Sequence, residues 1–541
     1  MDLDRKIGQL FVVAAPRPDL IHHVRDNHAG GVIWFQTTAA EAAETNAQLQ
    51  ALAEVPLLIS ADLEAGMGMR FTDAEWGLPA MALAATGDPA FAEEQARITA
   101  REARAIGINH VFAPVADVNV DPLNPVINTR SFGEDPHEVA RYVAAFVRGL
   151  ESEGVLATAK HFPGHGDTHV DSHRSLPLLD VTRERLEQVE LVPFRAAIAA
   201  GVSSVMVGHL GVPCIDATPA PVRAQFENAY GTFAAEVPHH ATIPATLSKP
   251  VIDLLRRELG FDGLVITDAM DMGGLAAHFD PGEAAVRAIE AGEDQILFSA
   301  DTDAAIAAVR EAVRSGRLSG ARIDESVARI LRAKERVRSR GGGPSPPQPL
   351  TRAAEDSAWR LRMTEVVRDA PEQSCHPEPP APPAPHEALG GDGPAAKDPL
   401  PSAAERSIAL VRDTHNLLPL TDKTLAIRAF SEDPLDDALA GLSGGCAIGA
   451  AEVIVLLLGA RPRSGAGRIA VAEEAKRIAR EQPRKTVVIA FGSPYILREL
   501  GDVSTFVCAW GPQPVLQRAA VRAVRGEIAM RGRVPVTISE D

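Results

Sequence analysis

The feature that most constrains the fold is a regular alternation of short apolar runs and amphipathic segments over the first 340 residues. Short apolar runs indicate buried strands, and helical periodicity between them indicates crossover helices. The expected strands are residues 7–14, 31–35, 56–62, 111–118, 156–161, 203–209, 264–268 and 295–299. The expected helices include residues 88–106, 136–153, 183–200, 249–259, 281–291, 302–314 and 324–336. About eight strand–helix units close a parallel sheet into a (β/α)8 TIM-type barrel, with an open doubly wound sheet as the alternative.

Two further segments follow the predicted α/β barrel. Residues 341–402 are rich in proline and glycine, a composition that does not build a core and predicts a linker, with a short helix at 352–368 inside it. Strand-like runs return at residues 407–411, 424–430, 453–458, 486–491 and 505–509, with helical patterns at 469–480 and 514–524. We therefore expect a catalytic barrel over residues 1–340, a linker over 341–402, and a smaller C-terminal α/β sandwich domain over 403–541.

Composition excludes several classes of partner. Lys and Arg number 54 against 72 Asp and Glu, a formal net charge of −18, and such a surface repels nucleic acid and anionic membranes.

The four cysteines form no close pair, which excludes a disulfide framework and a zinc finger. Residues 1–4 show no basic signal region, and no apolar run approaches the roughly 18 residues of a membrane span. We expect a cytoplasmic enzyme that acts on a small molecule.

Polar side chains stand where most of the predicted strands end. In a barrel of this type, catalysis occurs at the carboxyl ends of the strands. A buried acid needs a partner or a function, and salt bridges across the barrel mouth would explain only one or two of these positions. The residues in question are Asp62, Asp117, Asn119, Lys160, His161, His209, Asp268 and Asp301.

The loop at residues 160–173 contains four histidines and two aspartates among glycines and a proline. It could be a metal site, an acid/base site in which Asp171 orients His173, or a polar loop held by its own hydrogen bonds. The candidate metal ligands are His165, Asp167, His169, Asp171 and His173. Residue types and spacing leave all three interpretations open.

A second informative stretch, residues 260–274, contains a predicted apolar strand that ends at Asp268. A carboxylate placed in this way could attack an anomeric carbon, because its charge stabilises an oxocarbenium-like transition state and a covalent ester then forms. The alternative is that Asp268 caps the next helix, a role that Asp271 could serve equally well.

Several motifs together, in a fixed order, resemble glycoside hydrolase family 3. They are residues 60–66, 112–119, 124–127, 130–136, 160–173, 244–248 and 260–268. The resemblance is strong up to about residue 340 and looser in the second domain. Asp171-Ser172-His173 resembles the loop of the β-N-acetylglucosaminidase (β-hexosaminidase) branch, whereas other members usually take their acid from the second domain.

This resemblance implies roles for individual residues. Asp268 would be the nucleophile, His173 the acid/base and Asp171 its orienting partner. The positions that would bind the terminal sugar are Asp62, Arg70, Arg130, Lys160 and His161. The family needs no metal or cofactor. Arg70 follows a stretch, Glu64-Ala65-Gly66-Met67-Gly68-Met69, that departs from the family pattern.

The expected function is a retaining, exo-acting β-N-acetylhexosaminidase that hydrolyses terminal β-linked N-acetylglucosamine from small cell-wall or chitin-derived glycosides through a covalent glycosyl-Asp intermediate. An aromatic content of 4% suits a pocket for one sugar better than a polymer groove. The alternatives are a phosphorylase of the same glycosides, an inactive sugar-binding protein, and a metallohydrolase that uses the histidine-rich loop. The long segment 219–240 is expected to project from the catalytic face and to shape the leaving-group side.

Overall fold

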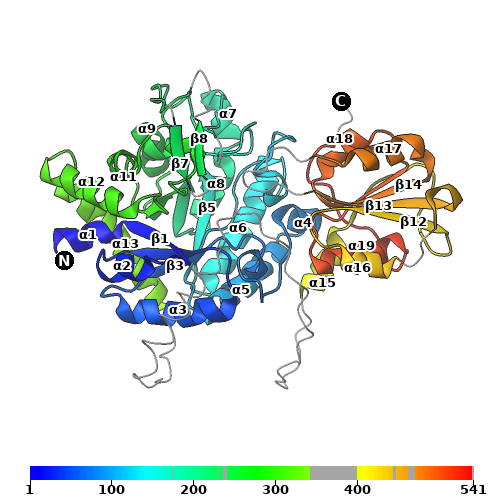
Figure 1. The fold of residues 1–541 in the computed structure, drawn as a ribbon, viewed down its shortest axis with the longest axis horizontal. Helices are drawn as coiled ribbons and strands as arrows, with labels where there is room; N and C mark the ends of the chain where they lie inside the picture. Colours follow the sequence, from blue (N-terminus) through cyan, green and yellow to red (C-terminus); the bar gives the residue numbers. More distant parts are fainter. Residues whose placement is uncertain are drawn as a thin grey trace.

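The computed structural model describes residues 1–172, 175–223, 225–228, 231–234, 241–340, 399–442, 446–460 and 470–538. The chain forms a barrel, blue to green in Figure 1, and a smaller domain, yellow to red. The predicted helix at 352–368 and most of the predicted linker lie outside the described residues, so those boundaries stay predictions.

Eight parallel strands form a nearly closed barrel, in the order β10-β1-β2-β3-β4-β5-β6-β9. A parallel bridge between Ile266 and Gln295 brings the two ends of the sheet together, which excludes an open doubly wound sheet. The strands are β1 (Phe11–Ala15), β2 (Gly31–Trp34), β3 (Leu58–Ala61), β4 (His110–Val111), β5 (Leu156–Phe162), β6 (Ser204–Val207), β9 (Leu264–Thr267) and β10 (Ile296–Leu297). The predicted TIM-type barrel is therefore confirmed.

Alternate residues of a strand such as β1 belong to separate hydrophobic clusters inside and outside the barrel, as the period of two in a strand requires. One cluster contains Val13, Val32 and Ile59 together with residues of the surrounding helices. A small second cluster, inside the barrel, draws one or two residues from each of several strands or their ends: Val12, Ala14, Ile33, Phe112, Met206, Ile266 and Leu297. The interior is thus packed with side chains, and in barrels of this type catalysis occurs at the rim.

Helices surround the barrel, and several begin at a side-chain cap. Asp135 and Asp280 each accept backbone hydrogen bonds in front of a proline at the first helical position. The helices are α1 (Leu3–Gln9), α2 (Leu20–Arg25), α3 (Ala39–Leu52), α4 (Ala80–Ala85), α5 (Ala90–Ala105), α6 (Pro136–Ser152), α7 (Arg183–Gln188), α8 (Leu191–Ala199), α9 (Lys249–Asp253), α10 (Gly273–Ala276), α11 (Pro281–Ala291), α12 (Thr302–Arg314) and α13 (Gly320–Ser339).

The predicted strand at 7–14 is wrong in its first half. Asp2 caps a helix by accepting the Arg5 N–H, and α1 continues to Gln9 before β1 begins at Phe11. The helix predicted over 183–200 is divided into α7 and α8. The predicted strand 111–118 is reduced to two residues, because Pro114 has no N–H to donate to a neighbouring strand.

The smaller domain is a five-stranded sheet between two layers of helices, as predicted. The strand order is β11-β15-β14-β13-β12, and only β11 is antiparallel to its neighbour. Figure 1 shows α17 and α18 on one face and α15, α16 and α19 on the other. The elements are α15 (Pro399–Ser407), β11 (Ala409–Asp413), β12 (Leu425–Phe430), α16 (Asp436–Gly441), β13 (Val453–Ala460), α17 (Glu473–Glu481), β14 (Thr486–Gly492), α18 (Leu497–Leu500), β15 (Thr505–Cys508) and α19 (Pro514–Val524).

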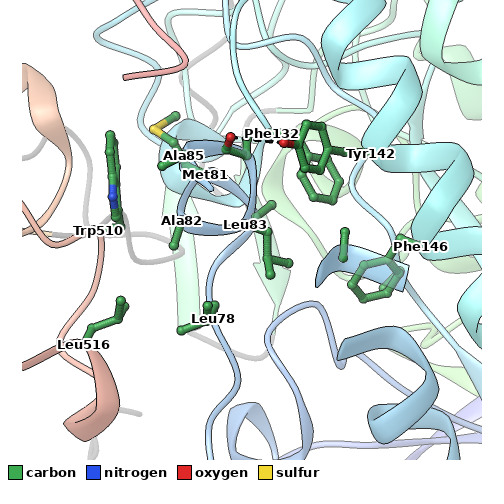
Figure 2. Close-up of a cluster of buried hydrophobic side chains, with 14 of the residues drawn as sticks. Leu78, Met81, Ala82, Leu83, Ala85, Phe132, Tyr142, Phe146, Trp510 and Leu516 are labelled. Atoms are coloured by element: carbon green, nitrogen blue, oxygen red, sulfur yellow. Dashed lines mark hydrogen bonds between the residues drawn. The ribbon is translucent and has the colours of Figure 1, made fainter. Parts of the chain in front are cut away.

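Helix α4 lies between the two domains. Figure 2 shows Leu83 on the side of Tyr142 and Phe146, whereas Trp510 and Leu516 of the smaller domain lie on the other side. Backbone hydrogen bonds also cross the interface, from Arg533 N to Ala85 O at 2.8 Å and from Glu134 N to Pro535 O at 3.2 Å. The barrel and the smaller domain therefore share a packed core. Among the described helices, none combines the length and hydropathy needed to cross a bilayer.

A buried lysine at the base of the barrel generates a prediction about stability. Lys334 Nζ donates to Gln9 Oε1 at 2.6 Å, and burial lowers the pKa of Lys334 from 10.5 to about 7. Between pH 7 and pH 10.5 Lys334 is mostly protonated in the unfolded chain and mostly neutral in the folded chain. The burial of this lysine therefore lowers the free energy of unfolding, and the effect is largest at pH 7 and below. Lys334→Met is expected to raise the Tm there, by an amount that shrinks as the pH rises towards 10.5.

Thermal denaturation across this pH range measures the effect. Lys249→Met, at an exposed lysine of α9, serves as the matched control and is expected to leave the Tm nearly unchanged. A gain at Lys334 that is the same at every pH would contradict the prediction.

Candidate active site

A chain of ion pairs lies at the carboxyl ends of β3 and β5. Lys160 Nζ lies 2.7 Å from Asp62 Oδ1 and 2.7 Å from Glu64 Oε1, and its side chain is 2% exposed. Arg70 pairs with the other oxygen of Asp62. Arg130 forms a two-pronged contact with Glu64, at 2.9 Å through Nε and 2.8 Å through Nη2. Four of the five predicted sugar-binding residues therefore belong to one network, which Glu64 completes.

The charges of this network stabilise one another. Burial acts to raise the pKa of Asp62 and of Glu64, but the positive charges around them outweigh it and hold both pKa values well below their usual range. Burial likewise opposes the charge of Lys160, yet the two carboxylates raise its pKa. All the members are thus ionised at neutral pH. Three cations face two anions, which leaves one positive charge in excess.

Asp117 organises the fifth predicted sugar-binding residue, His161. Its carboxylate lies 2.8 Å from His161 Nδ1 and accepts the backbone N–H of His165 at 2.7 Å. A carboxylate at Nδ1 fixes the proton there and leaves Nε2 as the atom that can face a ligand. Asp117 is fully buried, so its contribution is to position other groups.

The histidine-rich loop is held by His165. Its Nδ1 lies 2.7 Å from Thr168 Oγ1, and its Nε2 lies 3.1 Å from Ser172 Oγ. Burial lowers the pKa of His165 to about 4, so this imidazole is neutral and acts as a structural support. A Cβ on Gly166 would lie 1.7 Å from Val118 O, so only glycine fits against the backbone of the segment after β4.

Among the described residues, the candidate metal ligands of this loop do not converge. His169 pairs with Asp121 at 2.7 Å, and Asp167 pairs with Arg185 at 3.3 Å. His173 lies outside the described residues. Asp171, its predicted partner, is buried at 3% exposure.

Asp268 directly follows β9. Its backbone N–H donates to Val207 O at 2.9 Å, and its carboxylate accepts the N–H of Ala269 at 2.8 Å. His209 lies 2.9 Å from Ala269 O and holds the same turn from β6. Because α10 begins only at Gly273, Asp268 is not the cap of that helix. Ser172 O accepts the Gly274 N–H at 2.8 Å, which joins the histidine-rich loop to α10.

Three residues that support the site were not among the predicted site residues. Glu64 lies inside the 60–66 motif, and Asp117 and His209 were expected only as polar strand ends. One strand-end position has a different role, because Asp301 caps α12 by accepting the Ala304 N–H at 2.9 Å.

Comparison with known proteins identifies the family. The family model described as glycosyl hydrolase family 3 N terminal domain matches residues 2–333. The chain belongs to glycosyl hydrolase family 3. It is similar to the β-N-acetylglucosaminidase/β-glucosidase of Cellulomonas fimi, with 32% identity over 99% of this chain and 94% of that protein. It is also similar to β-hexosaminidase A of Pseudoalteromonas piscicida, with 35% identity over 59% of this chain and 55% of that protein.

A solved family 3 β-N-acetylglucosaminidase from Paenibacillus sp. str. FPU-7 is 31% identical, with a TM-score of 0.78 over 100% of both chains. The predicted branch of family 3 is confirmed, and the chain is a glycosidase of that branch.

In this family 3 member, the segment after β6 is attached to α10 and to the turn that follows it. The Arg223 guanidinium donates to the carbonyls of Ala276 and Phe279 at 3.0 and 3.1 Å. His278 Nδ1 lies 2.6 Å from Pro221 O. A hairpin of β7 (Gln225–Asn228) and β8 (Gly231–Ala234) follows. Its base is thus fixed to α10 and the turn that follows it.

The second domain of this glycosidase also reaches the rim of the barrel. Asn119 Nδ2 donates to the Tyr495 hydroxyl at 3.1 Å, and both residues are buried. Asn119 lies two residues after Asp117, so the contact supports the segment after β4 that contains Asp117.

The ion-pair network generates a prediction about Glu64. Glu64→Gln removes the carboxylate partner of Arg130 and leaves the buried Lys160 with Asp62 alone. Loss of one partner from a buried ion pair costs about 3–5 kcal/mol. We expect a lower Tm together with a higher KM, because both cations lose the group that orients them.

Chemical denaturation and steady-state kinetics test this expectation. Glu138→Gln removes the same charge from an exposed pair with Arg141 and is expected to cost about 0–1 kcal/mol. Wild-type stability and KM in Glu64→Gln would show that the network is not needed for substrate binding.

Proposed function

We propose that this glycosidase is a retaining, exo-acting β-N-acetylhexosaminidase that removes terminal β-linked N-acetylglucosamine through a covalent ester on Asp268. The observation that carries the proposal is the placement of a carboxylate directly after β9, on the same rim as the Asp62–Lys160–Glu64 network. The names of the relatives described above support N-acetylglucosamine as the sugar.

The ion-pair network suits the recognition of one sugar residue. Lys160 is almost fully covered, whereas the side chains of Asp62, Arg70 and Arg130 keep 15%, 25% and 25% of their surface exposed. Exposed carboxylate oxygens accept hydrogen bonds from hydroxyls, and guanidinium groups donate them. The charged partners fix these groups in place before the sugar arrives, which lowers the cost of binding.

The proposed reaction has two steps. Asp268 attacks the anomeric carbon while protonated His173 gives its proton to the glycosidic oxygen, so the C–O bond breaks and the aglycon leaves. Neutral His173 then takes a proton from water, whose oxygen attacks the anomeric carbon and releases Asp268. Asp171 orients His173 in both steps. The β configuration is retained because each step inverts it.

Small cell-wall or chitin fragments are the proposed substrates. With 4% aromatic residues, the chain has few rings on which a polymer could stack. The hairpin fixed to α10 through Arg223 is proposed to contact the leaving group, because α10 follows the Asp268 turn.

The nucleophile assignment predicts the outcome of a rescue experiment. Asp268→Gly is expected to lose turnover of a nitrophenyl N-acetylglucosaminide, and azide is expected to restore it by occupying the vacated space. Because only one inversion then takes place, the product is the α-glycosyl azide, which nuclear magnetic resonance identifies.

Asp262→Gly, at an exposed acid before the same strand, is the control and is expected to keep wild-type turnover without azide. A fully active Asp268→Gly enzyme would overturn the assignment. If the wild-type protein binds N-acetylglucosamine but turns over no glycoside, it is an inactive sugar-binding protein instead.

Phosphorolysis is a second candidate function, favoured by the excess of one cation in the network. A histidine acid/base also places one negative charge fewer beside the ester than a carboxylate would, which lowers repulsion of a phosphate acceptor. Hydrolysis predicts free N-acetylglucosamine whether or not phosphate is present. Chromatography of products formed with and without phosphate decides, since N-acetylglucosamine 1-phosphate would establish phosphorolysis.

A further inference from the structure

We propose that His22, His23 and Asp303 form a binding site for a divalent transition-metal ion of the Zn²⁺ type, on the barrel wall where α2 meets the first turn of α12. Their ligand atoms all lie within 4.8 Å of one another. His22 Nε2 is 3.4 Å and His23 Nδ1 is 3.8 Å from Asp303 Oδ1. Two imidazoles and a carboxylate are the donor types that Zn²⁺ prefers.

Asn27 occupies the centre of this group. Its Nδ2 lies 3.3 Å from His22 Nε2, 3.0 Å from His23 Nδ1 and 2.6 Å from Asp303 Oδ1. Three acceptors therefore surround an amide nitrogen that has only two hydrogens. The three acceptors point at one position, and a metal cation there would interact with all three, whereas the amide can donate only two hydrogens. Rotation of the Asn27 amide would turn its Oδ1 inward as a fourth ligand, giving two nitrogens and two oxygens.

The remaining imidazole nitrogens already have the partners that metal-bound histidines usually have. His22 Nδ1 lies 3.1 Å from Asp26 Oδ2, and His23 Nε2 lies 3.1 Å from Asp19 Oδ2. A carboxylate on the outer nitrogen holds the proton there and leaves the inner lone pair for the metal. Burial lowers the pKa of His23, so this imidazole is neutral.

The position in the fold indicates what a metal would do there. Helix α2 follows β1 and α12 follows β10, and these strands pair through only two residue pairs, Phe11–Ile296 and Val12–Leu297. This pairing joins the first and last strand–helix units of the barrel. A metal ion held by both helices would clamp that junction. The predicted catalytic and sugar-binding residues lie on other strands and loops, so the expected effect is on stability, with turnover unchanged.

Zn²⁺ is the probe, added to the metal-free full-length chain at mildly alkaline pH, because hydrogen bonding to Asp26 raises the pKa of His22. Calorimetric titration is expected to show one site, and Zn²⁺ is expected to raise the Tm. His22→Ala and Asp303→Ala, both at exposed side chains, should each weaken binding at least tenfold. The controls His137→Ala and Asp502→Ala remove an exposed histidine and aspartate elsewhere and should bind as the wild type does.

Asn27→Asp separates a metal site from a plain hydrogen-bond network. Without metal, a second carboxylate beside Asp303 is expected to lower the Tm by repulsion. Zn²⁺ should restore it and bind more tightly than to the wild type, because a charged ligand replaces the amide. Absence of Zn²⁺ binding to the wild-type chain, or binding that persists in both His22→Ala and Asp303→Ala, would overturn the proposal.

Discussion

The site depends on the burial of a single ammonium group. Lys160 is 2% exposed, and a charge so enclosed is tolerated only when partners replace the lost water. Asp62 and Glu64 supply that replacement from the loop after β3, and each is paired in turn with an arginine. The network therefore ties β5 to β3 and to the 124–136 segment. The ion pairs fix the positions of these side chains relative to one another.

Several polar groups near this network use their polar atoms in hydrogen bonds to neighbouring residues. Asp117 is occupied by His161 and by the His165 N–H, and His165 is occupied by Thr168 and Ser172. These hydrogen bonds hold the described part of the loop, residues 160–172, against the segment after β4 that contains Asp117.

The strands could be predicted because each one has its own apolar run, and their number favoured a barrel, whereas closure itself is shown by the bridge between Ile266 and Gln295. The helix at the start of the chain could not be predicted. Asp2 caps this helix by accepting the Arg5 N–H, and the helix includes Ile7, whose apolar run suggested a strand. At the site, parallel strands end on one rim, so Asp62, Lys160 and Asp268 could be assigned to it together. The partner of Arg130 could not be assigned, because Glu64 is 66 residues away and meets it only when the barrel forms.

The smaller domain supports the rim of the barrel through hydrogen bonds. Its Tyr495 holds Asn119, and its Pro535 carbonyl accepts the Glu134 N–H, so it reaches both ends of the segment that carries Arg130. These contacts are hydrogen bonds to buried or backbone groups, which fix geometry and transfer no proton. If His173 in the barrel loop is the acid/base, as proposed, the second domain supplies no catalytic residue. Its contact with Asn119 then holds a residue two positions from Asp117, the carboxylate that contacts His161.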